Sequence, residues 1–291
     1  MQELEKPLKV IKDRFFEGER PLFGITDTTI ENVKFYPGES ALKHTKNIVS
    51  RQCEYMCKYP FWHGDHIVMS DSIFTTYARA AIWYSKNLYM KDCLVDAPKM
   101  FRRVSDLTVE NSRFTHAEET LWNCDHVTLR DVELENADYV FMNGEDIDIE
   151  NMTLQGNYSF QDGKNITIRN SHLKSKDALW GTENVTVYDS VLEGEYLAWH
   201  SKNLRLVNCT IRGEQPLYYS TNLVLENCRM EETDLCFEYS DVKADIVSDI
   251  ISVRNPKSGY IRAQNIGEII IDEHCINPGK CQIEVLAKAT V

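Results

Sequence analysis

The sequence predicts an all-β protein, a right-handed parallel β-helix whose single chain winds through about twelve coils of 19–21 residues. The first observation behind this prediction is an internal repeat. Asn165, Asn184, Asn203 and Asn222 begin similar segments and lie 19 residues apart, and the same frame runs back to Asp27. A fixed period over most of a chain is typical of a solenoid, whose repeats bury their apolar faces against their neighbours.

The second observation is the alternation inside one coil. Ile166 and Ile168 alternate with Thr167 and Arg169, the two-residue rhythm of a strand with one buried face. Helical-pair repeats need about 33 residues or more, whereas a coil of strands closes in about twenty. The Leu pattern of leucine-rich repeats and the six-residue division of a hexapeptide helix are both absent. A parallel β-helix with longer coils remains, and parallel crossovers are right-handed as a rule.

The third observation is a polar column five residues after the frame position. Side-chain amides and carboxylates at a bend can bond to the next coil, so this column predicts a ladder of stacked residues. Its members are Asn32, Gln52, Asp71, Asp92, Asn111, Asp131, Asn151, Asn170, Asp189, Asn208 and Asn227. We assign this column, and the small and apolar columns that follow it, to internal packing.

The elements follow from this frame in chain order. Residues 1–20 are charged and are expected to cap the first coil, and the regular coils are expected over residues 21–247. Residues 248–259 break the period with Pro and Gly, which predicts a surface loop. Residues 260–291 contain two strand-like runs around a Pro-Gly turn and should form the last coil and the C-terminal cap. Because the repeat crosses every plausible boundary, we expect one domain over residues 1–291.

The coil length, the Asn-type ladder and the opening FFEGERPLF at residues 15–23 resemble an uncharacterised bacterial family of unknown function, itself similar to the pectin-lyase-like parallel β-helix proteins. The family implies no activity. The wider superfamily includes polysaccharide lyases, polygalacturonases and carbohydrate esterases, but a fold alone does not carry function. The Asn-Thr-Asp, Asp-Asp, Gly-His-Gly and Arg-Ile-Lys signatures of polygalacturonases do not occur here, so no catalytic residue is carried over. Whether the protein is an enzyme stays open; a polysaccharide lyase or glycoside hydrolase activity is what the resemblance implies.

A row of aromatic residues is the candidate binding site. The column five positions before the frame residue is apolar and should face the core, so the next column of the same predicted strand should face outward. All five tryptophans lie in that next column, with flanking columns that include His63, Tyr84 and Arg103. The predicted ligand-binding residues are Trp62, Trp83, Arg102, Trp122, Trp180 and Trp199.

Three interpretations of this row remain open. It can be a structural ladder of stacked rings, a platform for sugar rings, or a protein-binding edge rich in Trp and Arg. An exposed sugar platform predicts that Trp122→Ala weakens ligand binding and leaves the thermal midpoint nearly unchanged. Glu118 and Asp138 fall on adjacent coils and are the one carboxyl pair considered for acid and base catalysis, against a solvated turn.

Charge restricts the ligand. A formal net charge of −13 argues against nucleic acid and anionic membranes. It also disfavours an acidic polysaccharide unless Lys99, Arg102 and Arg103 form a local basic patch, so a neutral glycan is the simpler expectation. The expected partner is therefore an oligosaccharide or polysaccharide, bound by a monomer or homodimer.

Location and cofactors follow from the cysteines and the termini. The chain has neither a leader-like N-terminus nor an apolar run of about eighteen residues, and its nine cysteines are an odd number. We therefore expect a cytoplasmic protein with free, buried thiols at Cys209 and Cys228. Cys53, Cys57, His63 and His66 are spaced roughly like zinc ligands, but Cys53 belongs to an inward column. No metal and no cofactor are expected.

Overall fold

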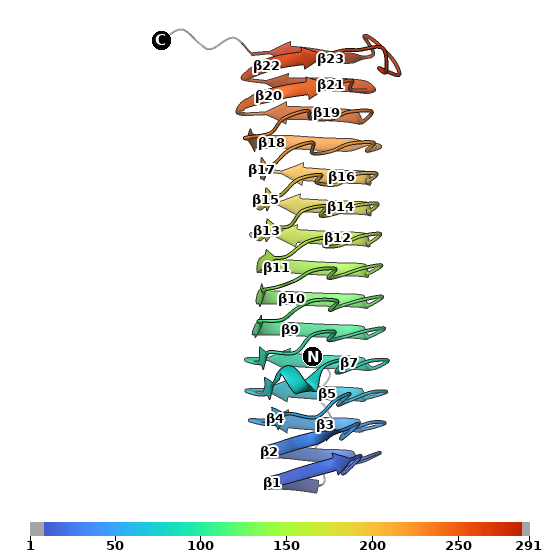
Figure 1. Cartoon of the computed structure of the whole chain (residues 1–291), viewed down its shortest axis with the longest axis vertical. Helices are drawn as coiled ribbons and strands as arrows, with labels where there is room; N and C mark the ends of the chain where they lie inside the picture. The colour runs from blue at the N-terminus through green and yellow to red at the C-terminus, as the bar shows by residue number, and fades with distance from the viewer. Residues whose placement is uncertain (1–8, 287–291) are drawn as a thin grey trace. The chain divides into compact units, whose positions relative to one another are not determined.

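The structure is a computed structural model that describes residues 9–286. It divides into two compact units, Met1–Asp148 and Ile149–Val291, called unit 1 and unit 2 below. Each unit is a parallel β-solenoid whose strands stack as successive rungs (Figure 1). No helix within the described residues is long and apolar enough to cross a bilayer.

Unit 1 is built from parallel strand pairs that follow one another along the chain. Short strands of one coil pair with short strands of the next, as in β3–β5–β7 and β4–β6–β8, and the longer strands β2 and β9 join both series. The strands are β1 (Lys9–Glu19), β2 (Thr26–Glu39), β3 (Lys46–Arg51), β4 (Glu54–Tyr55), β5 (Asp65–Ser70), β6 (Ile73–Phe74), β7 (Lys86–Lys91), β8 (Leu94–Val95), β9 (Ser105–Phe114) and β10 (Asp125–Leu134). A short 3-10 turn, η1 (Thr76–Ala78), is inserted after β6.

Unit 2 repeats the same pattern. The strand β11 (Glu145–Gln155) crosses the boundary between the units, and its last residues pair with β13. The other strands are β12 (Lys164–Arg169), β13 (His172–Lys174), β14 (Glu183–Tyr188), β15 (Val191–Glu193), β16 (Lys202–Val207), β17 (Thr210–Arg212), β18 (Leu223–Glu231), β19 (Asp241–Ile246), β20 (Asp249–Arg254), β21 (Ser258–Ala263), β22 (Asn265–Ile270) and β23 (Cys281–Val285).

The asparagine frame is a hydrogen-bonded ladder, as predicted. The Asn184 amide donates to the Asn165 Oδ1 at 3.1 Å, Asn203 donates to Asn184 at 2.8 Å, and Asn222 donates to Asn203 at 2.9 Å. All four residues have a positive φ of 54–58°. Asn tolerates this left-handed conformation better than most residues, which explains the residue type independently of the ladder.

The core consists of apolar columns in register. Ile166 pairs with Val185 and Val185 with Leu204, and the side chains of all three are buried. Cys209 and Cys228 are free and buried, as predicted. These columns are why a two-residue alternation in the sequence becomes a continuous interior.

One predicted boundary is wrong. The segment 248–259, expected as a surface loop, contains strand β20, which pairs in parallel with β22 and buries Ile250 and Val253. The coil is shortened there rather than interrupted, so the period fails while the packing continues. In the segment 1–20, predicted as a cap, the described part forms strand β1, which pairs only with β2 among the described strands; residues 1–8 lie outside the described residues. The described residues make about 15 turns, where the sequence predicted about twelve coils.

Candidate binding face

The segment that carries the tryptophans is a turn of repeated geometry and not the continuous strand that was predicted, although Trp83, Arg102 and Trp122 form single parallel bridges. Phe61 and His63 flank Trp62 with φ of 58° and 56°, and Ile82 and Tyr84 flank Trp83 with φ of 56° and 57°. A positive φ is costly for a side chain such as Ile. However, the same conformation recurs in coils without tryptophan, as at Phe141 and Asn143, so this strain belongs to the fold and does not mark a site.

Four of the predicted site residues form one stack in unit 1. The rings of Trp62 and Trp83 are 5.2 Å apart and 7° from parallel. The Arg102 guanidinium lies 4.4 Å from the ring centroid of Trp83 and 4.3 Å from that of Trp122. Lys43 Nζ lies 5.6 Å from the Trp62 ring. The tryptophans are half-buried, and the ring faces inside the stack are covered by their neighbours.

The indole nitrogens are also engaged. Trp62 Nε1 donates to the carbonyl oxygen of Ala80 at 2.6 Å, and Trp83 Nε1 donates to that of Lys99 at 2.8 Å. Trp122 Nε1 donates to the carbonyl of Tyr139. Each indole therefore lies across the backbone of the following coil, which fixes its ring plane and leaves mainly a ring edge toward solvent.

A second aromatic stack runs beside the first. His44 and His63 stack at 4.8 Å, and His63 stacks on Tyr84 at 5.1 Å. Tyr84 meets Trp62 edge to face, with the planes at 85°. The flanking column noted in the sequence thus forms an exposed outer ladder whose rings stand at right angles to the tryptophans.

Unit 2 has a stack of its own. Trp180 and Trp199 are 5.4 Å apart, and Trp199 lies parallel to Tyr218 at 5.1 Å. Beside it, His200 stacks on Tyr219 at 4.8 Å. The predicted residues Trp180 and Trp199 are therefore brought together, and Tyr218 joins them. Tyr218 occupies the tryptophan column in the sequence, a signal that was available before the structure.

A buried polar network adjoins the unit 2 stack. Burial and the nearby Glu238 raise the pKa of Tyr218. Glu238 is itself buried and forms an ion pair with Arg254 Nε at 3.0 Å. Asn255, fully buried, donates to Asp272 Oδ1 at 2.8 Å. The ion pair and the hydrogen bonds of Asn255 tie the last coils together, whereas the Tyr218 hydroxyl is buried without a hydrogen-bond partner.

The face around the unit 1 stack is rich in cations. Lys99 and Arg102 contact Glu119 at 2.9 Å and 3.4 Å, so the patch expected from Lys99, Arg102 and Arg103 is partly neutralised. Cations that form no ion pair within residues 9–286 are found in several places, among them Lys164, Lys202 and Lys243 in unit 2, and four of them lie around this stack. These four are Lys43, Lys58, Arg79 and Arg103, and we call them the cation rows.

The backbone places these cations on adjacent coils. The amide of Tyr59, next to Lys58, donates to the Arg79 carbonyl at 3.3 Å. On the other side of the stack, the Arg103 guanidinium lies 5.9 Å from the Tyr84 ring. The cation rows therefore flank the tryptophans on both sides.

Among the described residues, no group of His, Cys, Asp and Glu side chains is arranged to hold a metal ion. Cys53 directs its thiol to backbone carbonyls of Ile30 and Arg51, away from the histidines. Glu118 and Asp138 do lie on adjacent coils, since the amide of Glu119 donates to the Asp138 carbonyl at 2.8 Å. A catalytic role for this pair stays a prediction.

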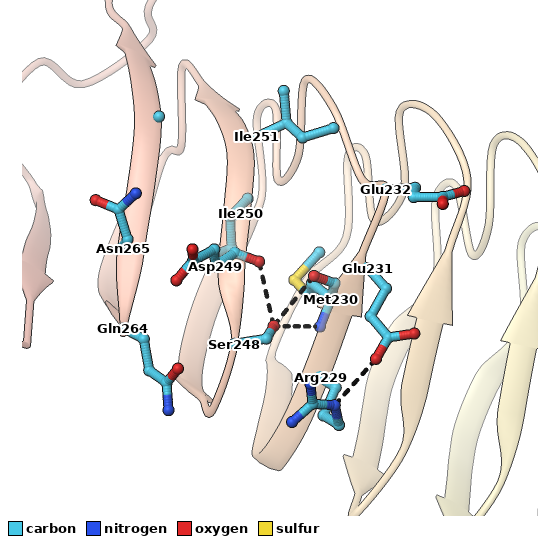
Figure 2. Close-up of a pocket in the computed structure, with 11 residues that line it drawn as sticks. Arg229, Met230, Glu231, Glu232, Ser248, Asp249, Ile250, Ile251, Gln264 and Asn265 are labelled. Carbon is cyan, nitrogen blue, oxygen red and sulfur yellow. Dashed lines mark hydrogen bonds and ion pairs between the residues drawn. The ribbon is translucent and has the colours of Figure 1, made fainter. Parts of the chain in front are cut away.

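The hollows of the surface lie elsewhere. In unit 2 a groove of about 600 Å³ opens between β18, β20 and β22, and none of the predicted site residues lines it (Figure 2). Figure 2 shows Ser248 at the base of this groove, where its Oγ accepts a hydrogen bond from the Met230 amide at 2.8 Å. A side chain thus replaces a backbone ladder bond where β20 diverges from β18.

A family model described as "Protein of unknown function (DUF3737)" matches residues 9–284. The chain belongs to this family. The family covers the strands of both units, including the aromatic stacks. No curated protein matches this member of the family.

Several solved structures resemble this chain in fold. PfbA, a surface adhesin of Streptococcus pneumoniae, is 8% identical with a TM-score of 0.45, over 88% of this chain and 83% of that one. The A-module of the Azotobacter vinelandii mannuronan C-5 epimerase AlgE4 is 12% identical with a TM-score of 0.36, over 96% and 81%. A mannuronic acid specific polysaccharide family 6 lyase from human gut microbiota is 10% identical with a TM-score of 0.35, over 96% and 89%. Likenesses at this level assign no function to the DUF3737 chain.

Proposed function

We propose that this protein is a non-catalytic carbohydrate-binding β-solenoid, and that the aromatic face of unit 1 takes an acidic oligosaccharide or polysaccharide. The observation that carries the proposal is the placement of the cation rows. In a protein with a formal net charge of −13, Lys58, Arg79 and Arg103 are exposed beside the tryptophan stack and form no ion pair within the described residues. Unpaired cations also occur elsewhere on this protein, but these three lie beside an aromatic stack, and this combination favours an anionic ligand.

The stack itself determines how such a ligand would be held. Sugar rings pack on exposed ring faces, but the faces of Trp83 are covered by Trp62 and Arg102. Binding would therefore use the cation rows for carboxylates, and exposed groups such as His63, Tyr84 and Asn123 for hydroxyls. Ring edges, which carry the positive part of the aromatic quadrupole, would face the same anionic ligand. This replaces the neutral glycan of the sequence prediction with a charged one.

The test is a titration of the full-length protein with oligosaccharides of matched length, one series of uronic acids and one neutral series, at two salt concentrations. We expect binding of the acidic series only, weakened by about tenfold or more between ~0.05 M and ~0.5 M salt, because exposed charges are screened. Equal binding of the neutral series would contradict the charge argument. New reducing or unsaturated ends in the mixture would contradict the non-catalytic part of the proposal.

A second candidate function is a protein interface, and a specific observation favours it. The covered ring faces and Tyr84, which is 39% exposed, fit the composition of a protein-binding patch better than a sugar platform. A dimer whose tryptophan fluorescence is protected from acrylamide would support this reading of the face. A monomer with accessible tryptophans and salt-sensitive glycan binding would support the first proposal.

The cytoplasm is the location that goes with either function. Its basis is the free state of the buried cysteines, including Cys209 and Cys228, which suits a reducing compartment. The ligand would then be an oligosaccharide that reaches that compartment. Fractionation of cells that produce the protein checks the location directly.

A further inference from the structure

Exposed aliphatic side chains gather in the last two rungs of unit 2, one on β20 and the others on or beside β22 and β23. Between residues 149 and 250 of the described chain, no large aliphatic side chain is exposed. From there on they are frequent, each between 45% and 57% exposed: Ile251, Ile269, Ile271, Ile276, Val285 and Leu286. Apolar patches of this kind on an otherwise polar surface mark contact sites.

The last of these rungs also presents unpaired strand edges. Within residues 9–286, β22 pairs only with β20, and β23 pairs only with β21. Ile261 and Ala263 of β21 are fully buried opposite Ile283 and Val285, but Val285 is itself 47% exposed. The strand β23 thus continues the core columns of the solenoid and has no described rung beyond it. Such an edge is a template for pairing with another chain.

The edge of unit 1 at β1 is protected in a way that this rung is not. β1 places Lys9 opposite Thr28 and Arg14 opposite Val33, and both Thr28 and Val33 are fully buried. Charges in columns that elsewhere point to the core are a recognised device against edge pairing. In the columns of these two charges β23 carries Cys281 and Val285, whereas the column between them is apolar in both strands, with Ile11 in β1 and Ile283 in β23.

We propose that the rung of β22 and β23 is a self-association surface, through which two copies of this chain pair tail to tail. The occupant is a second copy in a two-fold arrangement because that arrangement sets apolar residues on apolar residues and closes on itself. Stacking β1 of another copy on this rung would instead set the charges of Lys9 and Arg14 into columns where β23 carries Cys281 and Val285, and burying a charge against apolar side chains is expensive. The proposal is independent of the glycan-binding face.

Charge at the rim predicts how the contact responds to salt. Glu268 and Glu273 are exposed on this rung, and Glu284 pairs with Arg262 of its own chain at 3.2 Å. In a two-fold contact these carboxylates approach their own copies, so salt screens a repulsion and strengthens the dimer. A head-to-tail contact of this acidic rung with Lys9, Lys12 and Arg14 would be weakened by salt.

The test is sedimentation of the full-length protein over a concentration series at low and high salt. We expect a monomer–dimer equilibrium that tightens with salt. Val285→Lys, which copies the protection used at β1, should weaken the dimer by at least about tenfold. The matched control is Phe15→Lys on β1, since Phe15 is 66% exposed at the other end of the chain, and it should leave the dimer unchanged. Circular dichroism of both variants verifies that they fold.

Three outcomes would overturn the proposal. One is a wild-type monomer at all concentrations. Another is a series of higher oligomers lost in both variants, which would mean head-to-tail stacking. The third is a dimer that survives Val285→Lys and is lost on substitution of Tyr84, which would place the contact on the aromatic face.

Discussion

Trp62 and Trp83 lie one coil apart with ring centroids separated by 5.2 Å and planes 7° from parallel. Each ring thus covers one face of the other, and Arg102 covers the second face of Trp83. The tryptophan row therefore contributes to the internal packing of the fold as well as to its surface. The packing of the ring faces therefore contributes to the stability of the protein. Ligand binding would instead use the ring edges and the neighbouring cations.

Trp83→Ala should destabilise the protein by about 2 to 4 kcal/mol, somewhat less than a fully buried Trp, because the side chain is half-buried. The same reasoning applies to Trp122, for which the sequence suggested an unchanged thermal midpoint: its ring stacks on Arg102 at 4.3 Å. Thermal melting measures the effect. Tyr77→Ala, at a side chain that is 66% exposed, is the control and should cost no more than about 0.5 kcal/mol. Equal melting of all three variants and the wild type would show that the stack contributes nothing.

The Asn184 position separates backbone conformation from the ladder bonds. Asn184 has φ of 58°, donates to Asn165 and accepts from Asn203. Asn184→Gly keeps the left-handed conformation and loses the ladder, whereas Asn184→Ala loses both. We expect costs of roughly 1 kcal/mol for Gly and roughly 2 kcal/mol for Ala, measured by denaturant unfolding. If the Asn184→Ala variant were as stable as the Asn184→Gly variant, the positive φ would not explain why Asn stands at this position.

The buried thiols should resist modification. The hydrogen bond with Cys209, together with burial, raises the pKa of Cys228, and burial raises the pKa of Cys124 to about 12. Because the thiolate is the reactive form, these residues should react with a thiol reagent at pH 8 at least about tenfold more slowly than the half-buried Cys275. Mass spectrometry of a labelling time course assigns the rates. Early modification of Cys228 in the native protein would contradict the packing described for this column.

The histidines give a pH dependence whose sign differs between two positions. Burial, followed by the charges of His44 and Lys43, lowers the pKa of His63 below 6.5. The unfolded chain therefore binds this proton first, so the contribution of His63 to stability is present above about pH 6.5 and is lost as the pH falls below it. A hydrogen bond to Asp125 raises the pKa of His126 above 6.5, so its contribution is present below that pH and is lost as the pH rises through the raised value.

The measurement for this pair is the unfolding free energy from pH 5 to pH 8 for the wild type, His63→Asn and His126→Asn. Relative to the wild type, His63→Asn should be less harmful at pH 5 than at pH 8, and His126→Asn should be less harmful at pH 8. Differences of the same sign for both variants would refute the assignment.

The columns of the solenoid could be predicted because a coil of near-constant length repeats its residue types in register. Asn165 and Asn184 are an example: their spacing of 19 residues in the sequence predicted that they stack, and they are hydrogen-bonded to each other in the structure. The positive φ of Phe61 and Ile82 could not be predicted, because burial selects an apolar residue there and hides the conformation that Asn or Gly would reveal. The strand β20 was missed because Pro256 and Gly259 suggested a loop, although the shortened coil still buries Val253.

The candidate site was predicted in part. The tryptophan column gave the stacks of both units, because neighbours in a column must meet. The electrostatics could not be obtained from residue types alone. Lys99 and Arg102 looked like the basic patch, but Glu119 compensates both, and the cations without ion pairs, such as Arg79, became apparent only when the pairs were known.

The central claim, that the cation rows beside the tryptophans bind an acidic glycan, is tested most directly by charge reversal. The variant Lys58→Glu, Arg79→Glu, Arg103→Glu is compared with Lys164→Glu, Lys202→Glu, Lys243→Glu, which makes the same change in net charge at exposed lysines of unit 2. We predict that the first variant loses binding of an oligouronate by at least about a hundredfold, as several ionic contacts are reversed, and that the second stays within about threefold of the wild type. Equal affinities of the two variants for the oligouronate would contradict the account.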